Sequence, residues 1–263
     1  MKQQGLAYAS LTLAMVIVGS SVVAGKLLVE TVPVFIASAL RFGIASVLFL
    51  LIWWMTDREK PAFAKSELRL LLLMSFTGTF LFSTCMLFGL QYTGATEAGV
   101  MTSTTPVLTA LLAALLLKER LAWPIVFGVL AAFIGVALIQ TSQPPVGVAG
   151  GSTLWGSLLI FVAVVGEALF SVIGKGLTAK YRPFTISAMV SILGFLMFVP
   201  LAVLQMIQLD FTLDLLTLAD WSYLVYYALV VTLLGYYFWY VGVKRVPGHV
   251  SGLFTAVLPV SAV

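Results

Sequence analysis

The amino-acid sequence predicts an all-α integral membrane protein, an inverted repeat of five transmembrane helices (5+5) whose last helix is truncated. Three observations predict this class. The 263 residues are 61% hydrophobic and 9% charged, whereas soluble domains carry about 25% charged residues. Long stretches contain no charged residue, and similar landmarks recur about 150 residues apart.

The uncharged stretches are long enough to cross a bilayer as helices, which takes about 20 residues. They are residues 3–25, 70–96, 98–117, 121–166, 183–209 and 221–243. The run at 121–166 has room for two helices, with Pro144 and Pro145 at the break between them. Polarity does not alternate along these runs, which favours helices over the strands of a transmembrane barrel.

These stretches and the remaining apolar runs together predict nine spans in order along the chain. The expected spans are 6–28, 34–55, 68–90, 95–117, 122–140, 153–174, 184–205, 221–242 and 249–263. The first is longer than the apolar part of a signal peptide, so we expect it to be retained. The last apolar run rises only about 21 Å as a helix, and we expect a truncation there.

Basic residues predict the orientation, because cytoplasmic loops are enriched in Lys and Arg. One side of the expected membrane collects twelve of them: Lys2, Arg58, Lys60, Lys65, Arg69, Lys118, Arg120, Lys175, Lys180, Arg182, Lys244 and Arg245. The other side has only Lys26. We therefore expect a multi-pass protein of the bacterial cell (inner) membrane with a cytoplasmic N-terminus. Topology accounts for the net charge of +4, so nucleic-acid binding is not indicated.

An internal repeat is predicted by landmarks that keep nearly one spacing. The pairs are Lys26 with Lys175, Pro33 with Pro183, and Pro106 with Pro259, at offsets of 149, 150 and 153. We expect a first repeat at 1–141 and an incomplete second repeat at 150–263. Five spans is an odd number, so the second copy enters the membrane from the opposite side, as in many secondary transporters. The alternative is chance similarity among apolar helices.

Several segments resemble the EamA-type ten-helix transporters of the drug/metabolite transporter superfamily. The segments are residues 95–107 (ATEAGVMTSTTPV), 117–121 (LKERL), 39–42 (ALRF), and Gly128 with 135–139 (GVALI). The resemblance implies a ten-helix inverted repeat with both ends cytoplasmic and a central cavity. It also implies export of amino acids or related metabolites. The missing tenth helix departs from that pattern.

Charges inside spans are costly and usually face a cavity or a partner. Arg41 lies about 10 Å along the second span from its outer end, and we expect it and Glu97 at one membrane level. Arg41 could bind a substrate carboxylate through its planar guanidinium. Alternatively it pairs with Glu97 or extends toward the membrane surface.

Glu167 lies in the inner half of the sixth span and is a second candidate. It would bind an ammonium group or carry a coupling proton. The alternative is a structural partnership with a nearby lysine such as Lys175 or with a helix terminus. Pro106 and Pro259 lie inside their spans, where proline kinks a helix and exposes carbonyl groups. Thr102 and its hydroxyl neighbours would satisfy those carbonyls or line a polar path, or simply pack between helices.

Further candidates lie at the ends of spans and in an aromatic cluster. Gln91 and Tyr92, at the end of the third span, are possible cavity residues. Glu119 is a structural candidate, expected to fix the turn after the fourth span. An aromatic cluster near the eighth span is expected to form an interfacial belt, with stacking on an aromatic substrate as the alternative. Its members are Tyr226, Tyr227, Tyr236, Tyr237, Phe238, Trp239 and Tyr240.

The sequence argues against most catalytic functions. One Cys and one His predict no metal site, since structural zinc takes four such ligands. We expect no cofactor, and the P-loop signature is missing. The leading hypothesis is a secondary transporter of small molecules, working by alternating access and driven by the substrate gradient or protons. A channel or scramblase and a membrane-embedded enzyme are the alternatives.

Overall fold

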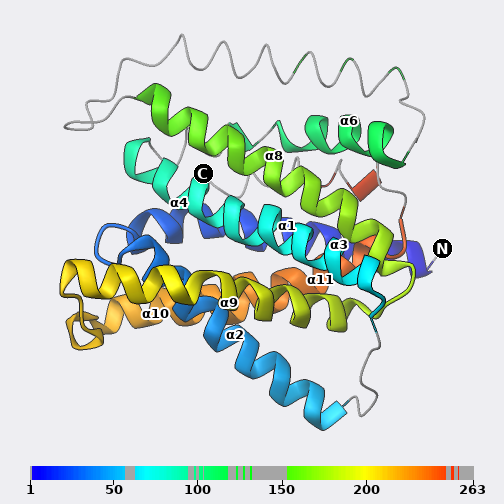
Figure 1. Ribbon diagram of the computed structural model, residues 1–263. Coiled ribbons are helices and arrows are strands. Elements are labelled where there is room, and N and C mark those ends of the chain that lie inside the picture. The colour runs from blue at the N-terminus through cyan, green and yellow to red at the C-terminus, as the bar shows by residue number, and fades with distance from the viewer. Residues whose placement is uncertain are drawn as a thin grey trace.

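The computed structural model describes residues 2–56, 63–93, 98, 101–102, 104–117, 123, 127, 131, 153–246, 250–251 and 254. Within these residues all regular structure is helical (Figure 1). The elements are α1 (Lys2–Leu28), α2 (Val34–Thr56), α3 (Lys65–Ser75), η1 (Phe76–Leu81), α4 (Phe82–Tyr92), α6 (Thr105–Leu117), α8 (Thr153–Thr178), α9 (Pro183–Leu209), η2 (Leu213–Leu215), α10 (Leu218–Tyr226), η3 (Tyr227–Leu234) and α11 (Gly235–Val243).

Six helices in this part of the chain are long and apolar enough to cross a membrane. They are Gln4–Leu28, Val34–Met55, Lys65–Tyr92, Leu154–Thr178, Pro183–Leu209 and Leu218–Val243. They confirm six of the expected spans. Most of the fifth and ninth expected spans lies outside the described residues, and the described part of the fourth is helical at 105–117.

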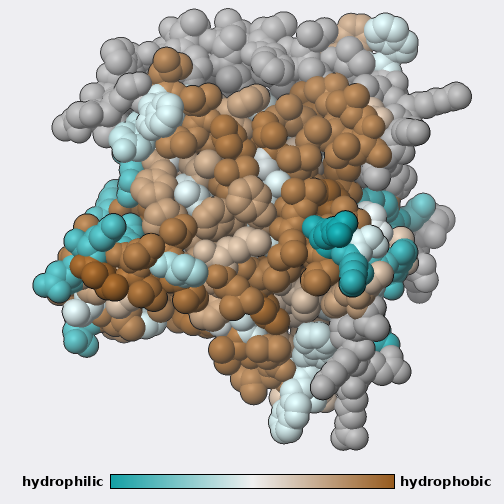
Figure 2. Space-filling model, in the orientation of Figure 1, coloured by the Kyte–Doolittle hydropathy of each residue, from teal (hydrophilic) through white to brown (hydrophobic). Residues whose placement is uncertain are grey.

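The surface of the bundle is the kind that lipid covers. Figure 2 shows an apolar face with hydrophilic side chains gathered toward two opposite ends of the molecule. Large apolar side chains such as Trp54, Leu196 and Ile207 are more than half exposed. An apolar surface of this extent favours hydrocarbon over water as the surrounding solvent. The chain is therefore an all-helical, multi-pass membrane protein.

The third span of each half contains a π-helical segment in its middle. In the first half η1 separates α3 from α4, and in the second half η3 separates α10 from α11. A π-helix shifts the backbone hydrogen bonds by one residue and is frequently found at functional sites. Both segments lie where the helices of the two halves meet, since η1 packs on α8 and η3 on α2.

The packing of the two halves is reciprocal. Helix α1 lies against α11, α8 lies against α4, and α2 lies against α9. Glycines allow the first two contacts: a Cβ atom on Gly242 would lie 2.5 Å from Cγ of Leu11, and one on Gly89 would lie 2.6 Å from Cγ1 of Ile160. Gly89 and Gly242 are 153 positions apart, and Leu11 and Ile160 are 149 apart. The same contact is therefore built twice.

Two lysines satisfy carbonyl groups at helix ends in the same reciprocal way. Lys26 donates from Nζ to the carbonyl oxygens of Leu90, at 2.5 Å, and Thr93, at 3.2 Å. Lys175 donates to those of Val243, at 2.8 Å, and Val246. The acceptors in the second half lie 153 positions after those in the first. A cation at a helix C-terminus stabilises the unpaired carbonyls and the helix dipole.

Candidate functional site

A cavity lies in the middle of the bundle, between the two halves. Its lining comes from α1, α2, η1, α4 and Thr102 in the first half, and from α8, η3 and α11 in the second. The cavity volume is about 70 Å³, where a single water needs about 10–15 Å³ on the same scale. It therefore has room for a ligand of several non-hydrogen atoms.

Arg41 brings a guanidinium group to this cavity from α2, with 7% of the residue exposed. Nη2 donates a hydrogen bond to Oγ of Ser83 at 2.8 Å. Cζ lies 4.3 Å from the ring centroid of Phe42 and 4.9 Å from that of Tyr227, within cation–π range. Its partners here are all neutral, and no carboxylate in the described part of the chain is within ion-pair distance of it.

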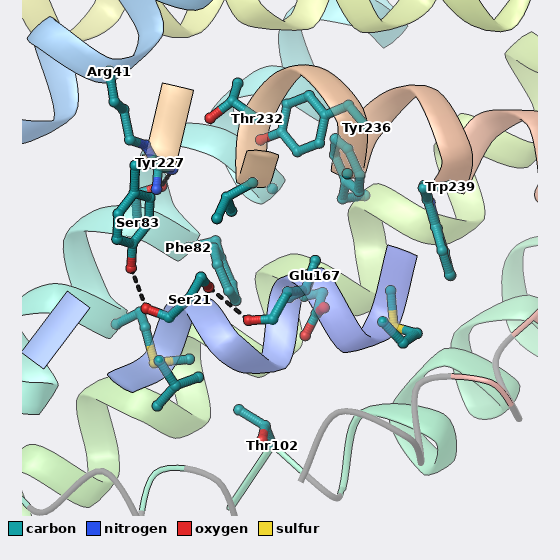
Figure 3. A pocket seen from close by; sticks show the side chains of 18 of the residues that line it. Ser21, Arg41, Phe82, Ser83, Thr102, Glu167, Tyr227, Thr232, Tyr236 and Trp239 are labelled. Atoms are coloured by element: carbon teal, nitrogen blue, oxygen red, sulfur yellow. Dashed lines mark hydrogen bonds between the residues drawn. The ribbon is translucent and has the colours of Figure 1, made fainter. Parts of the chain in front are cut away.

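The ring of Tyr227 is itself held in place. Its hydroxyl donates to the backbone oxygen of Ser21 on α1 (Figure 3). A Cβ atom on Gly25 would lie 2.5 Å from that hydroxyl, so glycine allows η3 to approach α1 this closely. Ser83 and the two rings thus fix the position of the Arg41 guanidinium before any ligand arrives.

Glu167 brings a carboxylate to the same cavity from α8. Oε2 accepts a hydrogen bond from Oγ1 of Thr105, the first residue of α6, at 3.1 Å. The alternative pair with Lys175 does not form, because that lysine reaches the end of α11 instead. Figure 3 shows Arg41 and Glu167 reaching the cavity from different helices and well apart from each other.

The rest of the cavity wall is mostly apolar and aromatic. Phe82 and Met86 contribute from α4, Phe170 from α8, and Tyr236 and Trp239 from α11. Nε1 of Trp239 and Nε of Arg41 are buried without a hydrogen-bond partner among the described residues. Convergent polar groups within an apolar pocket are typical of small-molecule sites.

The structure brings three of the candidates from the sequence together around this cavity: Arg41, Thr102 and Glu167. Gln91 and Tyr92 lie half-buried at the end of α4 and are not part of the described lining. Glu97, Glu119 and Pro259 lie outside the described residues.

Pro106 lies inside its expected span, next to an interruption of the helix. The chain is helical at Met101 and Thr102, turns at Thr104, and begins α6 at Thr105. Pro106 is therefore in the first turn of α6, where its missing N–H costs no hydrogen bond. The break places Thr105 beside Glu167.

Sequence reasoning missed Ser83 and assigned the wrong environment to part of the aromatic cluster. The belt is wrong for Tyr227, Trp239 and Tyr240, which are buried in the bundle. Tyr227, Tyr236 and Trp239 line the cavity, so the alternative of stacking on a substrate stays open. A serine in an apolar helix gives no signal by itself. A tyrosine in an apolar helix gives no such signal either.

The comparisons with known proteins agree with this architecture. The profile of the EamA-like transporter family matches residues 5–141 and again residues 154–263. The chain is 48% identical over 262 residues to the "Uncharacterized transporter YetK" of Bacillus subtilis, covering 100% of this chain and 78% of that protein. It is 28% identical over 228 residues to an "Uncharacterized transporter" of Archaeoglobus fulgidus, covering 87% of this chain and 76% of that protein.

A solved structure, titled "Crystal structure of protein", has a similar fold. It superposes with a TM-score of 0.68 at 18% identity, over 96% of this chain and 84% of that one. At this identity the likeness concerns the fold alone. In the part of the chain that is described here, no three His, Cys, Asp or Glu side chains are close enough to hold a metal ion.

Proposed function

We propose, since this chain belongs to the EamA-like transporter family, that it carries small zwitterionic metabolites such as amino acids across the cell membrane by alternating access. As a member of that family it is a membrane transporter and not an enzyme. One observation supports the proposed substrate class above all others. A guanidinium group and a carboxylate, Arg41 and Glu167, line one buried cavity and are each held by neutral partners.

The basic end of the site suits a carboxylate. A buried charge is costly unless it is paired, and the described partners of Arg41 bring no opposite charge. A guanidinium group presents several N–H donors in one plane and binds a carboxylate through two of them. Nη2 of Arg41 donates a hydrogen bond to Ser83, and the other N–H groups of Arg41 are left for a ligand.

The acidic end suits an ammonium group. Glu167 accepts one hydrogen bond from Thr105 and keeps further acceptor capacity, since a carboxylate offers about four lone-pair sites. A zwitterion would compensate both protein charges at once, which neither an amine nor an acid alone can do. A proton on Glu167 is the other way to remove its charge and would couple transport to pH.

The reciprocal contacts support an inverted repeat of five helices with exchangeable states. The Gly242–Leu11 and Gly89–Ile160 contacts, like the lysine contacts at the helix ends, occur once in each half at nearly constant offsets. In inverted-repeat carriers each half adopts in turn the conformation of the other, which opens the site to alternate sides. The proposed halves are residues 1–141 and 150–263.

We further propose a bacterial inner-membrane location with a cytoplasmic N-terminus and net export. The excess of Lys and Arg on one side supports the orientation, and the named relatives come from a bacterium and an archaeon.

Ligand stabilisation of the purified protein tests the substrate class. Amino acids should raise its melting temperature in detergent, because a ligand that binds only the native state stabilises it. Matched amines and carboxylic acids that lack one of the two charges should raise it less. If either singly charged series stabilises the protein as well as the zwitterions do, the two-charge site is wrong.

Counterflow in liposomes then tests the mechanism. A carrier loaded with unlabelled substrate accelerates uptake of labelled substrate, whereas a channel or scramblase does not. Absence of accelerated exchange for a ligand that stabilises the protein would favour a channel.

A further inference from the structure

Two carboxylates outside the cavity occupy equivalent places in the two halves. Glu67 is the third residue of α3 and accepts the backbone N–H of Ala64 at 2.9 Å. Asp220 is the third residue of α10 and accepts the backbone N–H of Thr217 at 2.8 Å. Each thus caps the helix that begins its own third span. The two acids are 153 positions apart, the same offset that relates the helix ends capped by Lys26 and Lys175.

Each carboxylate is also bound by the other half of the protein. Lys180 donates from Nζ to Oε1 of Glu67 at 2.7 Å, and the hydroxyl of Tyr181 donates to Oε2. Thr31 donates from Oγ1 to Oδ1 of Asp220 at 2.5 Å. All three donors lie in the turn between the first and second spans of their half, and Thr31 and Lys180 are 149 positions apart.

These two contacts are at opposite ends of the bundle. In Figure 1 the loop before α10 is at one end of the parallel helices, and the turn between α8 and α9 meets the start of α3 at the other. The cavity with Arg41 and Glu167 lies between them. Each contact therefore fastens the two halves together on one side of the cavity.

Building on the proposed function, we propose that Glu67 with Lys180 and Tyr181, and Asp220 with Thr31, are the two gates of the carrier. The halves must separate at one end at a time for the cavity to open to one side. Each gate joins the halves through side chains that a small rotation would part, while the capping hydrogen bonds stay within one half. Opening one side then breaks one gate and leaves the other closed.

The two gates differ in chemistry. At the first, Glu67 has a charged donor and a phenol, and its hydrogen bond to Tyr181 raises the pKa of that phenol above its usual value. At the second, Asp220 is buried and has a neutral donor from the other half. Lys180 is 67% exposed along its side chain, so water and salt weaken the ion pair.

The donors can be removed without touching either helix cap. One variant combines Lys180→Met and Tyr181→Phe. The other variant carries Thr31→Val. Lys65→Met removes a neighbouring exposed cation, and Ser222→Ala removes a hydroxyl that bonds only within α10, so these are matched controls. All would be made in a Cys85→Ser background, because Cys85 is the single cysteine.

Access to the cavity is measured with a reporter, Ser171→Cys on α8, and a second, Ser21→Cys on α1. A membrane-impermeant maleimide is added to right-side-out and to inside-out vesicles. The first-gate variant should label about fivefold faster from one side, and Thr31→Val about fivefold faster from the other, with both controls unchanged. Lys180→Arg with Tyr181 retained should label as the unaltered protein does.

Labelling that accelerates from the same side in both gate variants overturns the proposal. Labelling rates that stay unchanged in both gate variants, whichever reporter is used, overturn it as well. Thermal stability of each variant shows that it is folded. Ligand stabilisation of the unaltered protein, measured in the same preparations, distinguishes failure of the gates from failure of the proposed function.

Discussion

Arg41 places a guanidinium group inside an apolar bundle, where burying a charge is costly. Its surroundings explain how that cost is lowered. Two aromatic rings and one serine hydroxyl surround it, and 7% of the residue is exposed. Aromatic faces and a hydroxyl reduce the cost of burying the cation without cancelling its charge. Such an arrangement holds the group in one position and leaves its charge for a ligand.

Arg41→Lys should weaken zwitterion binding about ten- to a hundredfold, because charge-assisted hydrogen bonds contribute about 1.5–3 kcal/mol. Lysine keeps the charge but loses the planar donors and the stacking on Phe42 and Tyr227. Affinity would be measured from ligand-dependent melting temperatures. Arg245→Lys, at an exposed position after α11, is the control. Equal affinity in both variants would remove Arg41 from the site.

Glu167→Gln removes a charge but keeps an oxygen that can accept the hydrogen bond from Thr105. Zwitterion affinity should fall about tenfold or more. In the unaltered protein affinity should also decrease as the pH falls, since protonation removes the charge that attracts an ammonium group; in the variant this dependence should vanish. Binding would be measured across pH, with Asp214→Asn, at an exposed acid, as the control. A variant that keeps the pH dependence would exclude Glu167 as its origin.

The two charged candidates could be predicted from the sequence, whereas their partners could not. A charge within an apolar span is rare enough to be a signal on its own. Ser83 and Tyr227 become important only through contacts with distant parts of the chain, and neither residue type is unusual in a membrane helix. The same holds for Thr105, which contacts Glu167 because a turn at Thr104 interrupts the helix.

At the scale of the element, charge-free length identifies the spanning helices but not their internal irregularities. The π-helical segments η1 and η3 follow no composition signal, because one shifted hydrogen bond depends on how neighbouring helices pack. Their effect is visible at Gly78 in η1, which lines the cavity and lies against the ring of Phe170. Close helix approach of this kind depends on glycine.

Gly166→Ala should destabilise the protein by about 1–3 kcal/mol, the usual cost of overpacking. A Cβ atom there would lie 2.5 Å from the backbone oxygen of Thr77, which cannot rotate away as a side chain could. Gly176→Ala, in the same helix α8, meets nothing within 4 Å and should be neutral or stabilising, because alanine favours helix. Melting temperatures in detergent would measure both. If both variants melt at the same temperature, the close contact between α8 and η1 does not determine the stability of the protein.

At the scale of the whole molecule, the repeat connects observations that are otherwise separate. One pair of offsets, 149 and 153, relates the helix-end lysines, their acceptors, the glycine contacts and the two capping acids. Equivalent residues then face opposite ends of the bundle, as Glu67 and Asp220 do. The geometry is what a carrier needs if its two halves exchange conformations around one site.

The proposed inversion makes a prediction about exposed, equivalent positions. Glu30 and Ala179 lie 149 positions apart, each in the turn after the first span of its half, and both are exposed. In a Cys85→Ser background, Glu30→Cys should react with an impermeant maleimide added outside intact cells, whereas Ala179→Cys should react only in inside-out vesicles. Both variants keep the cavity residues intact, so retained ligand stabilisation confirms their folding. Labelling of both from the same side would mean that the halves are parallel, and two parallel halves could not exchange conformations across the membrane.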